Sequence, residues 1–449
     1  MKQAFIILLT LATTLIIPSA FAANRVLSLD GDGDYVEVVD SESLNAINSQ
    51  VTMEAWIKPT AFPNNYIAII NKTDKLTSNY DNRSYALFLN RSGFLHLASA
   101  PSGKGQMNLN SPSGSIDLNT WYHVTGVINA KNSVMRIFLN GAEVASGAFG
   151  KDIHVSSLPL WIGWTHEAGH GAFAGQIDEV RIWNTARTQE EIRATMHTTL
   201  SGKETGLVGY WRFDVGKNIT LDSSQSHADG KLYGDAHGVE AELPQPEEVL
   251  IPTVVSGSIT AENGNPIQSA TVRLEQDGEE ITQTQSDAEG NYWLVISEKE
   301  GLRRGLYDLS ATKNELGDLR LGIRLREGES RTLNLTLKEA ISIEGKLMML
   351  DDITPHVAVV VQAVSDGKRI ATVLSDEEGK YRFINLKPGQ YQVRCYTTNG
   401  YVYYQNGEIL RVQRTSKLSD INFHMAPFKK GMWRHYTSLD GLPYNAVNY

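Results

Sequence analysis

Short segments in which apolar and polar residues alternate recur along this 449-residue chain, and an alternation with a period of two predicts β-strands. Two of the clearest segments are residues 26–38 and 173–184, which lie far apart in the sequence. In the second segment the alternation assigns side chains to two faces: Ile177, Glu179, Arg181 and Trp183 to one, and Asp178, Val180 and Ile182 to the other. Segments of this kind indicate a β-sheet protein.

Further strand segments occupy residues 51–59, 121–128, 135–144 and 206–214. Asn140 and Gly141 interrupt the third of them, and this dipeptide is typical of the type I′ turn of a β-hairpin. Helical periodicity is nearly absent. Its best candidate is residues 188–196, where Thr188 as N-cap and Glu191 three residues later have the spacing of a capping box. The pattern as a whole predicts an all-β protein.

The order of these segments resembles the laminin-G-like, concanavalin-type jelly-roll domains of bacterial exported proteins, and the resemblance covers residues 24–237. It implies a jelly-roll β-sandwich over residues 23–238, whose concave face and loops usually hold a ligand. An acidic, proline-containing stretch without alternation follows at residues 239–252 and is expected to be a linker.

Beyond this linker the chain repeats itself with a period of about 88 residues. Residues 286–292 and 375–381 both read Ser-Asp-x-Glu-Gly-x-Tyr. In each copy the Asp is expected to cap a turn with its own side chain, and the Gly to supply a positive φ. Each unit resembles a carboxypeptidase regulatory-like, or transthyretin-like, domain, at residues 253–339 and 340–427. The resemblance implies two tandem Ig-like sandwiches that act as non-catalytic spacers or adhesion modules.

The two ends of the chain differ from the rest. Residues 1–22 combine a basic start, an apolar stretch and a small-residue cleavage site after Ala22, which predicts a signal peptide and export to the periplasm, cell surface or exterior. Residues 428–449 resemble the opening of a two-component regulator propeller repeat. A single blade is not stable alone, so the chain is expected to be the amino-terminal part of a longer protein.

Composition narrows the function classes. The net charge of −10, without any run rich in Lys and Arg, argues against a nucleic-acid partner. No stretch after the signal peptide approaches the length of a membrane span. Cys395 is the single cysteine, so an intramolecular disulfide is impossible, and its place in an alternating strand predicts a buried, unreactive thiol.

Residues 166–170 read His-Glu-Ala-Gly-His and formally match a zinc-protease signature. That chemistry requires a helix that brings both imidazoles to one face, whereas this stretch lies between two predicted strands and contains Gly169. A loop is the better interpretation. The chain also lacks a Gly-x-Ser-x-Gly elbow and a phosphate-binding Gly-rich loop, so we expect a protein that is not an enzyme.

Acidic residues suggest a metal. Asp30, Asp32 and Asp34 alternate with glycines, and calcium prefers several hard oxygen ligands in a flexible loop. The stretch is not an EF-hand, because its twelfth position is Ser41. The jelly-roll resemblance implies that Asp178, in a strand beside the first one, belongs to the same structural calcium site. The alternative is a plain acidic turn capped by Asp34.

Aromatic and histidine side chains in predicted loops are the candidate ligand contacts: Trp164, His166, His170, Tyr66 and Tyr80. Sugar rings stack on aromatics while polar groups bind their hydroxyls, although loop aromatics also occur without a ligand. The sequence therefore predicts an exported, non-catalytic binding or adhesion protein for a glycan or matrix ligand. The alternative is the extracytoplasmic sensor portion of a longer two-component-type receptor. Neither the ligand nor the oligomeric state follows from the sequence.

Overall fold

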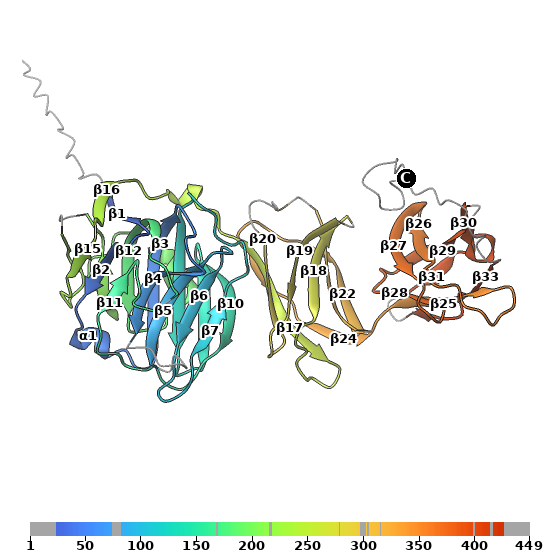
Figure 1. Ribbon diagram of the computed structural model, residues 1–449, viewed down its shortest axis with the longest axis horizontal. Helices are drawn as coiled ribbons and strands as arrows, with labels where there is room; N and C mark the ends of the chain where they lie inside the picture. The colour runs from blue at the N-terminus through green and yellow to red at the C-terminus, as the bar shows by residue number, and fades with distance from the viewer. Residues whose placement is uncertain are drawn as a thin grey trace, which may run out of the picture.

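The computed structural model describes residues 24–73, 82–167, 169–214, 218–277, 279–296, 302, 305–314, 316–397, 400–413 and 416–425. The predicted signal peptide, the predicted propeller segment and Tyr80 lie outside these residues. The described part is all-β, as predicted, and forms three β-sandwich domains in a row (Figure 1). Within it, no helix is long and apolar enough to cross a membrane.

The first domain is a jelly roll of two eight-stranded sheets. The first sheet consists of β1 (Arg25–Asp30), β3 (Gln50–Pro59), β8 (Tyr122–Asn129), β9 (Val134–Leu139), β10 (Ala142–Ala148), β12 (Ala174–Trp183), β13 (Leu207–Trp211) and β16 (His237–Glu240). Its order is β10-β9-β8-β3-β12-β1-β16, with β13 paired to β12. We call it the helix-covered sheet, because α2 (Gln189–Thr195) packs Ile192 on its outer side chains Val127 and Phe138.

The second sheet, called the open sheet below, has the order β14-β15-β2-β11-β4-β5-β6-β7. Its strands are β2 (Tyr35–Val38), β4 (Tyr66–Thr73), β5 (Arg83–Asn90), β6 (Leu95–Ser99), β7 (Met107–Asn110), β11 (Leu160–Ile162), β14 (Ile219–Thr220) and β15 (Gly230–Tyr233). A short helix, α1 (Glu42–Asn45), follows β2. Apolar side chains from both sheets, such as Leu87, Leu97, Ile128 and Ile137, form one core between them.

The predicted alternation in β12 is wrong beyond Asp178. Ile177 faces the core, but so do Val180 and Ile182, which the alternation assigns to the opposite side. The reason is a β-bulge: Glu179 has φ +50°, and the register against β3 shifts between Asp178 and Arg181. The extra residue reverses the side-chain alternation, so Glu179 and Arg181 leave the core face.

Two local predictions are confirmed. Asn140 and Gly141 both have positive φ and join β9 to β10, as a type I′ turn requires. Thr188 and Glu191 form a reciprocal capping box at the start of α2.

The second domain contains η1 (Pro246–Glu248) at its entrance, then β17 (Thr253–Ala261), β18 (Thr271–Gln276), β19 (Glu279–Gln285), β20 (Asn291–Ile296), β21 (Tyr307–Lys313), β22 (Leu316–Ile323), β23 (Ser330–Thr332) and β24 (Leu335–Glu339). The third contains β25 (Ser342–Met349), β26 (Val360–Ser365), β27 (Lys368–Leu374), β28 (Lys380–Ile384), β29 (Gly389–Thr397), β30 (Gly400–Tyr403), η2 (Tyr404–Asn406), β31 (Leu410–Val412), β32 (Lys417–Leu418) and β33 (Phe423–Met425). Each domain encloses its own apolar core.

The repeated sequence gives the repeated structure. Asp287 and Asp376 each accept a hydrogen bond from the backbone N–H four residues later, at 2.7 and 2.8 Å. The following Tyr292 and Tyr381 lie opposite Gly257 and Gly345 of the neighbouring strand, and each donates past this glycine to a backbone carbonyl, at 2.6 and 2.5 Å. Cys395 is buried among apolar side chains, which raises the pKa of its thiol to about 12. The prediction of a buried, unreactive thiol agrees with this position.

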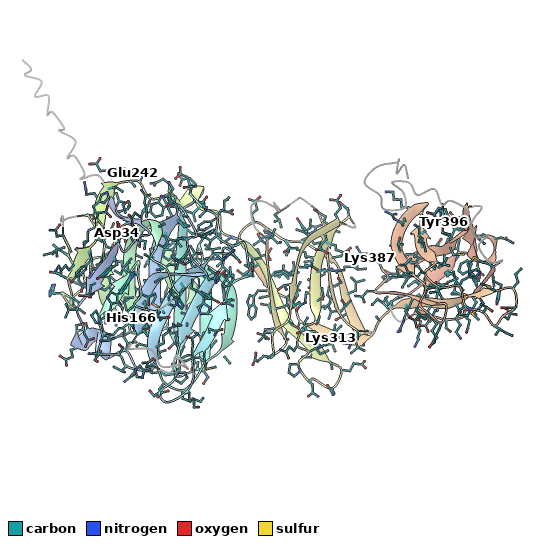
Figure 2. All side chains as sticks on the ribbon, in the orientation of Figure 1. Asp34, His166, Glu242, Lys313, Lys387 and Tyr396 are labelled. Carbon is teal, nitrogen blue, oxygen red and sulfur yellow. The ribbon has the colours of Figure 1, made fainter. Side chains whose placement is uncertain are left out.

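The domain borders are built from specific contacts. β16 pairs with β1, so the jelly-roll sheet continues to Glu240, past the predicted border at residue 238. Ile251 and Trp293 pack against the jelly-roll core at the first border. At the second border Lys387 of the third domain donates to Asp308 of the second at 2.6 Å (Figure 2).

Candidate functional site

The outer face of the open sheet carries polar and aromatic side chains. Tyr66 on β4, Phe88 on β5 and His96 on β6 are neighbours there. The segment after β11 crosses this face and is fixed to β4 by its backbone: Gly171 donates to the Tyr66 carbonyl at 2.8 Å and accepts from Ala68 at 3.2 Å. These two bonds place the side chains of Trp164, His166, Glu167 and His170 over the sheet.

A cluster of rings lies at one end of this face. The ring of Tyr66 lies 4.8 Å from that of His96 and 5.6 Å from that of His170, with Phe88 below them. His96 Nδ1 lies 2.6 Å from the amide oxygen of Asn110. Burial of His96 lowers its pKa to about 4, more than the bond to Asn110 raises it. The imidazole is therefore neutral at pH 7 and can both donate and accept a hydrogen bond.

A buried ion pair lies beside these rings. Arg83 and Glu167 pair directly, and each side chain is at most 2% exposed. Arg83 also donates to Gln106 at 2.5 Å, and His170 Nε2 lies 3.4 Å from Glu167 Oε2. The backbone N–H of Glu167 donates to Thr165 Oγ1 at 3.2 Å, which fixes the turn that carries the carboxylate. The sheet thus holds the Glu167 side chain at a defined place.

Several polar atoms of this turn remain without a partner among the described residues. Glu167 Oε1 is buried and accepts no hydrogen bond there, and neither ring nitrogen of His166 has a partner. An unsatisfied buried polar atom costs on the order of 1–3 kcal/mol, so native structures usually supply a water or a ligand to such atoms. The turn presents acceptors and a donor that fit the hydroxyl groups of a ligand.

A second aromatic group lies toward β2 and β15. Tyr35 stacks between Trp164 and Tyr233, with ring centroids 4.8 Å away on each side. Glu37 accepts from Trp161 Nε1 at 3.2 Å and from the Tyr233 hydroxyl at 3.3 Å. The stacked faces of these three rings cover one another, so other groups contact the stack mainly through the ring edges.

The structure gathers four of the five predicted ligand contacts, Trp164, His166, His170 and Tyr66, on this one face. Tyr80 lies outside the described residues. The described residues of the His-Glu-Ala-Gly-His stretch form no helix, which agrees with the interpretation as a loop.

Sequence reasoning missed other members of this face, namely Tyr35, Arg83, His96 and Tyr233. A usable signal was present for two of them. Tyr35 and Tyr233 alternate with the apolar residues of their strands, which assigns them to the outer face once the strands are placed.

The acidic residues divide into two places. Carboxylate oxygens of Asp30, Asp34 and Asp235 lie within 4.8 Å of one another. Burial raises the pKa of Asp34, whose oxygens accept the N–H groups of Asp30 at 3.2 Å and Asp235 at 2.8 Å. Asp32 is exposed in the same turn, and its N–H donates to Asp30 at 2.7 Å. An all-oxygen set of this kind suits calcium.

Asp178 does not join this group. In the ladder between β1 and β12, Asp30 lies opposite Ala174, four positions before Asp178. Asp178 instead accepts hydrogen bonds from Asn24 at 3.0 Å and from the backbone of Glu179 at 2.8 Å. Burial holds its pKa well above the usual range. The calcium site implied by the resemblance therefore combined residues that lie at two separate places in this structure.

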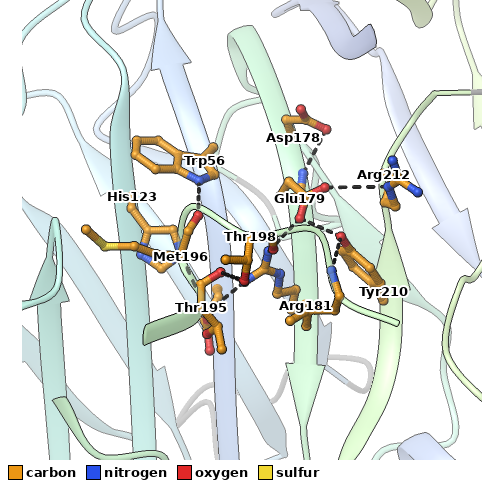
Figure 3. Close-up of polar contacts among 12 residues, drawn as sticks. Trp56, His123, Asp178, Glu179, Arg181, Thr195, Met196, Thr198, Tyr210 and Arg212 are labelled. Carbon is orange, nitrogen blue, oxygen red and sulfur yellow. Dashed lines mark hydrogen bonds and ion pairs between the residues drawn. The ribbon is translucent and has the colours of Figure 1, made fainter. Parts of the chain in front are cut away.

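The outer face of the helix-covered sheet holds a different polar layer (Figure 3). Glu54 is fully buried beside two arginines and a histidine: Arg187 at 2.7 Å, His123 at 3.5 Å and Arg181 at 3.8 Å. Burial alone would raise the pKa of Glu54, but His123 and the two guanidinium groups outweigh it and lower the pKa to about 2. Arg181 also donates to Glu179 at 2.5 Å. Charges that are paired with one another and covered by a helix indicate a structural role.

Three family models match the chain in succession. Residues 30–193 match the concanavalin A-like lectin/glucanases superfamily, residues 254–338 the carboxypeptidase regulatory-like domain, and residues 352–429 the SdrD B-like domain. The order confirms the jelly roll and the sandwich domains predicted from the sequence. The second repeat matches a different model from the first. No curated protein matches the sequence.

Part of the chain is similar to solved structures at low identity. One is a putative carbohydrate binding protein from Bacteroides ovatus, with 20% identity, 50% of this chain and 62% of that chain covered, and a TM-score of 0.39. A sialidase CBM40 from Ruminococcus gnavus, bound to α2,3 sialyllactose, has 17% identity, 38% and 96% coverage, and a TM-score of 0.32. A SAP-like pentraxin from Limulus polyphemus has 16% identity, 40% and 86% coverage, and a TM-score of 0.31. The chain thus spans less than two thirds of the first of these.

Proposed function

We propose that this chain, whose first domain matches the concanavalin A-like lectin/glucanases superfamily, is an exported, non-catalytic carbohydrate-binding protein. The ligand binds the outer face of the open sheet, between the Tyr66 ring cluster and the turn at His166 and Glu167. The second and third domains hold the jelly roll away from the point at which the chain is attached.

The observation that carries the proposal is the unsatisfied polar turn. Glu167 Oε1 and both nitrogens of His166 are buried without a partner among the described residues, directly beside partly exposed rings. A sugar combines hydroxyl groups with apolar C–H faces, so it can satisfy the polar atoms and contact the rings at the same time. A purely apolar ligand would leave the carboxylate oxygen unsatisfied.

The roles of the surrounding residues follow from their geometry. Arg83 fixes the Glu167 carboxylate through the buried pair, and His170 adds a second contact to it. Neutral His96 holds Asn110 and supports the ring of Tyr66. Because these supporting groups are buried and bonded, the site is formed before a ligand arrives, which lowers the entropic cost of binding.

A glycan array with the whole chain tests the proposal, followed by calorimetry with the best ligand. Tyr66→Ala and His166→Ala are each expected to weaken binding at least about tenfold, since each removes a contact worth about 1.4 kcal/mol. Tyr401→Ala, on the third domain, is the matched control and should bind normally. Silence of the array, or unchanged affinity in both variants, would overturn the proposal.

The absence of catalysis is tested with the same ligand. Prolonged incubation of the whole chain with the bound glycan is expected to release no new reducing ends. Release that is lost in His166→Ala would show an enzyme instead. Export is supported by the signal-peptide pattern of residues 1–22, and fractionation of cells that express the chain checks it.

We also propose a structural calcium ion between Asp30, Asp34 and Asp235. The ion would join the turn after β1 to the turn after β15. Asp34 and Asp235, which are hydrogen-bonded across these two turns, lie 201 positions apart in the sequence. Calcium is expected to raise the melting temperature of the whole chain and a chelator to reverse this, with Asp34→Asn insensitive to both. Asp152→Asn, outside the group, is the control. Equal melting with calcium and with chelator would contradict a bound ion.

A further inference from the structure

A positively charged hollow lies on the second domain, away from the jelly-roll site. It has a volume of about 830 Å³, and it is lined by three arginines, Arg324, Arg326 and Arg331, together with Leu306 and Leu325. The hollow lies where β22 ends and β23 begins. In a chain with a net charge of −10, such a concentration of positive charge is unusual.

These guanidinium groups differ from other arginines in the protein. Arg273 of the same domain lies 3.3 Å from Glu280, and Arg320 lies 3.7 Å from Asp318. By contrast, within the described residues no ion pair joins Arg324, Arg326 or Arg331 to a carboxylate. Three arginines and one glutamate, Glu329, line the hollow, so positive charge is in excess there and attracts an anion.

The one acidic residue of the hollow is already engaged. Glu329 accepts the backbone N–H of Arg326 at 2.9 Å and donates its own N–H to the Arg326 carbonyl at 3.1 Å, so it closes a turn. Arg331 donates to the carbonyl of Arg324, which fixes the guanidinium at the wall. The turn and this bond hold the backbone of the hollow in place before any ligand binds.

We propose that this hollow binds an acidic sugar residue of a polysaccharide. Its carboxylate or sulfate group pairs with Arg324, Arg326 and Arg331, whose planar forks match both anions, and its ring packs on Leu306 and Leu325. A concave pocket with an apolar wall fits a ring that carries an anion better than it fits a flat membrane surface. A nucleic acid would require an extended basic tract, and the acidic chain disfavours it. This inference does not depend on the jelly-roll site.

Calorimetry with the whole chain tests it. A heparin oligosaccharide supplies sulfate, an oligogalacturonate supplies carboxylate, and a maltooligosaccharide is the neutral probe. At least one acidic probe is expected to bind at low salt, and the double variant Arg324→Gln with Arg326→Gln should weaken it about tenfold or more. The neutral probe should show no dependence on these arginines.

Two control variants distinguish binding in the hollow from binding elsewhere on the molecule. Arg273→Gln removes one positive charge, half of that removed by the double variant, from another part of the same domain and should change the affinity less than about twofold. His166→Ala, in the jelly roll, should leave the effect of the double variant intact. Unchanged affinity in the double variant, or the same loss in Arg273→Gln, would overturn the proposal. Equal binding of a short DNA duplex would also overturn it, because the hollow would then select charge alone.

Discussion

The two outer faces of the jelly roll both carry charged side chains, but these side chains have different partners and only one face is covered by α2. On the helix-covered sheet, Glu54 lies among His123, Arg181 and Arg187, and α2 covers the layer. On the open sheet, Glu167 has a single arginine partner, Arg83, with His170 3.4 Å away. Each carboxylate keeps one oxygen without a hydrogen bond among the described residues, so the faces differ in the number of guanidinium partners and in the helix that covers one of them.

This difference separates stability from binding. A buried carboxylate surrounded by cations stabilises the fold only as a complete set, since loss of one member leaves the others uncompensated. A carboxylate with a free acceptor lowers stability slightly and can gain affinity when a donor arrives. We therefore expect mutations on the two faces to differ in size and in what they affect.

The largest effect is expected on the closed layer. Glu54→Ala leaves Arg187 buried without a carboxylate and Arg181 with Glu179 alone, and it should lower the free energy of unfolding by about 3–5 kcal/mol. Chemical denaturation measures this. Glu143→Ala, which breaks the partly exposed pair with Arg136, is the control and should cost at most about 1 kcal/mol. A small effect of Glu54→Ala would show that the layer is not cooperative.

Lowering the pH should reduce the stability of the folded protein in two different pH windows. Burial lowers the pKa of His96 to about 4, so as the pH falls the imidazole takes up a proton in the unfolded chain before it does so in the folded protein. The free energy of unfolding therefore falls between about pH 6.5 and pH 4, by on the order of 3 kcal/mol. The pKa of Glu54 is also lowered, to about 2, so its contribution is present above about pH 4.5 and is lost only below that value. Denaturation curves measured at a series of pH values from 7 to 3 cover both pH ranges. Burial also lowers the pKa of His123 on the closed face, so His123 contributes to the same upper window. His96→Gln should reduce the slope there without abolishing it, and an unchanged slope in this variant would contradict the assignment.

Two tyrosines offer a matched comparison. The Tyr210 hydroxyl on the closed face donates to Glu179 at 2.6 Å in a buried place, whereas the Tyr233 hydroxyl on the open face donates to Glu37 at 3.3 Å in a partly buried one. Tyr210→Phe should cost about 2 kcal/mol of stability and Tyr233→Phe about 0.5 kcal/mol. Thermal melts of both variants under one condition measure the difference. Equal losses would mean that the faces are equally packed.

A further small effect is expected for the helix that covers this sheet, α2. Thr188→Ala removes the side-chain cap of α2 and should lower stability by about 1 kcal/mol while glycan binding stays unchanged. Hydrogen exchange is the sharper measurement, because it should rise in α2 before it rises in β4 and β5. Uniform exchange over both sheets would show that α2 does not protect its face separately.

Local sequence rules predicted local structure well. The Asn140 hairpin, the Thr188 cap and the turns at Asp287 and Asp376 all depend on residues within a few positions, and all are present. The bulge at Glu179 was missed because nothing in the alternation marks an inserted residue.

The site required long-range information. Trp164, His166, His170 and Tyr66 could be proposed as loop residues, but the pairing of Arg83 with Glu167 depends on how β5 and the crossing segment are brought together. Likewise, Asp235 joins Asp30 and Asp34 only because β15 pairs with β2. Sheet pairing of this kind joins residues that no local pattern connects.

The pairing of β1 with β16 has a mechanical consequence. Arg25 lies opposite Glu240, so the chain enters and leaves the jelly roll at the same edge of the same ladder. A force applied to both ends would open the ladder one hydrogen bond at a time, like a zipper, rather than shear all of them together. A load carried from the open sheet to residue 240 would instead pass along the backbone from β15 to β16 and through the ladder between β16 and β1. Single-molecule pulling from the two ends should accordingly unfold this domain at lower force than pulling between the open sheet and residue 240.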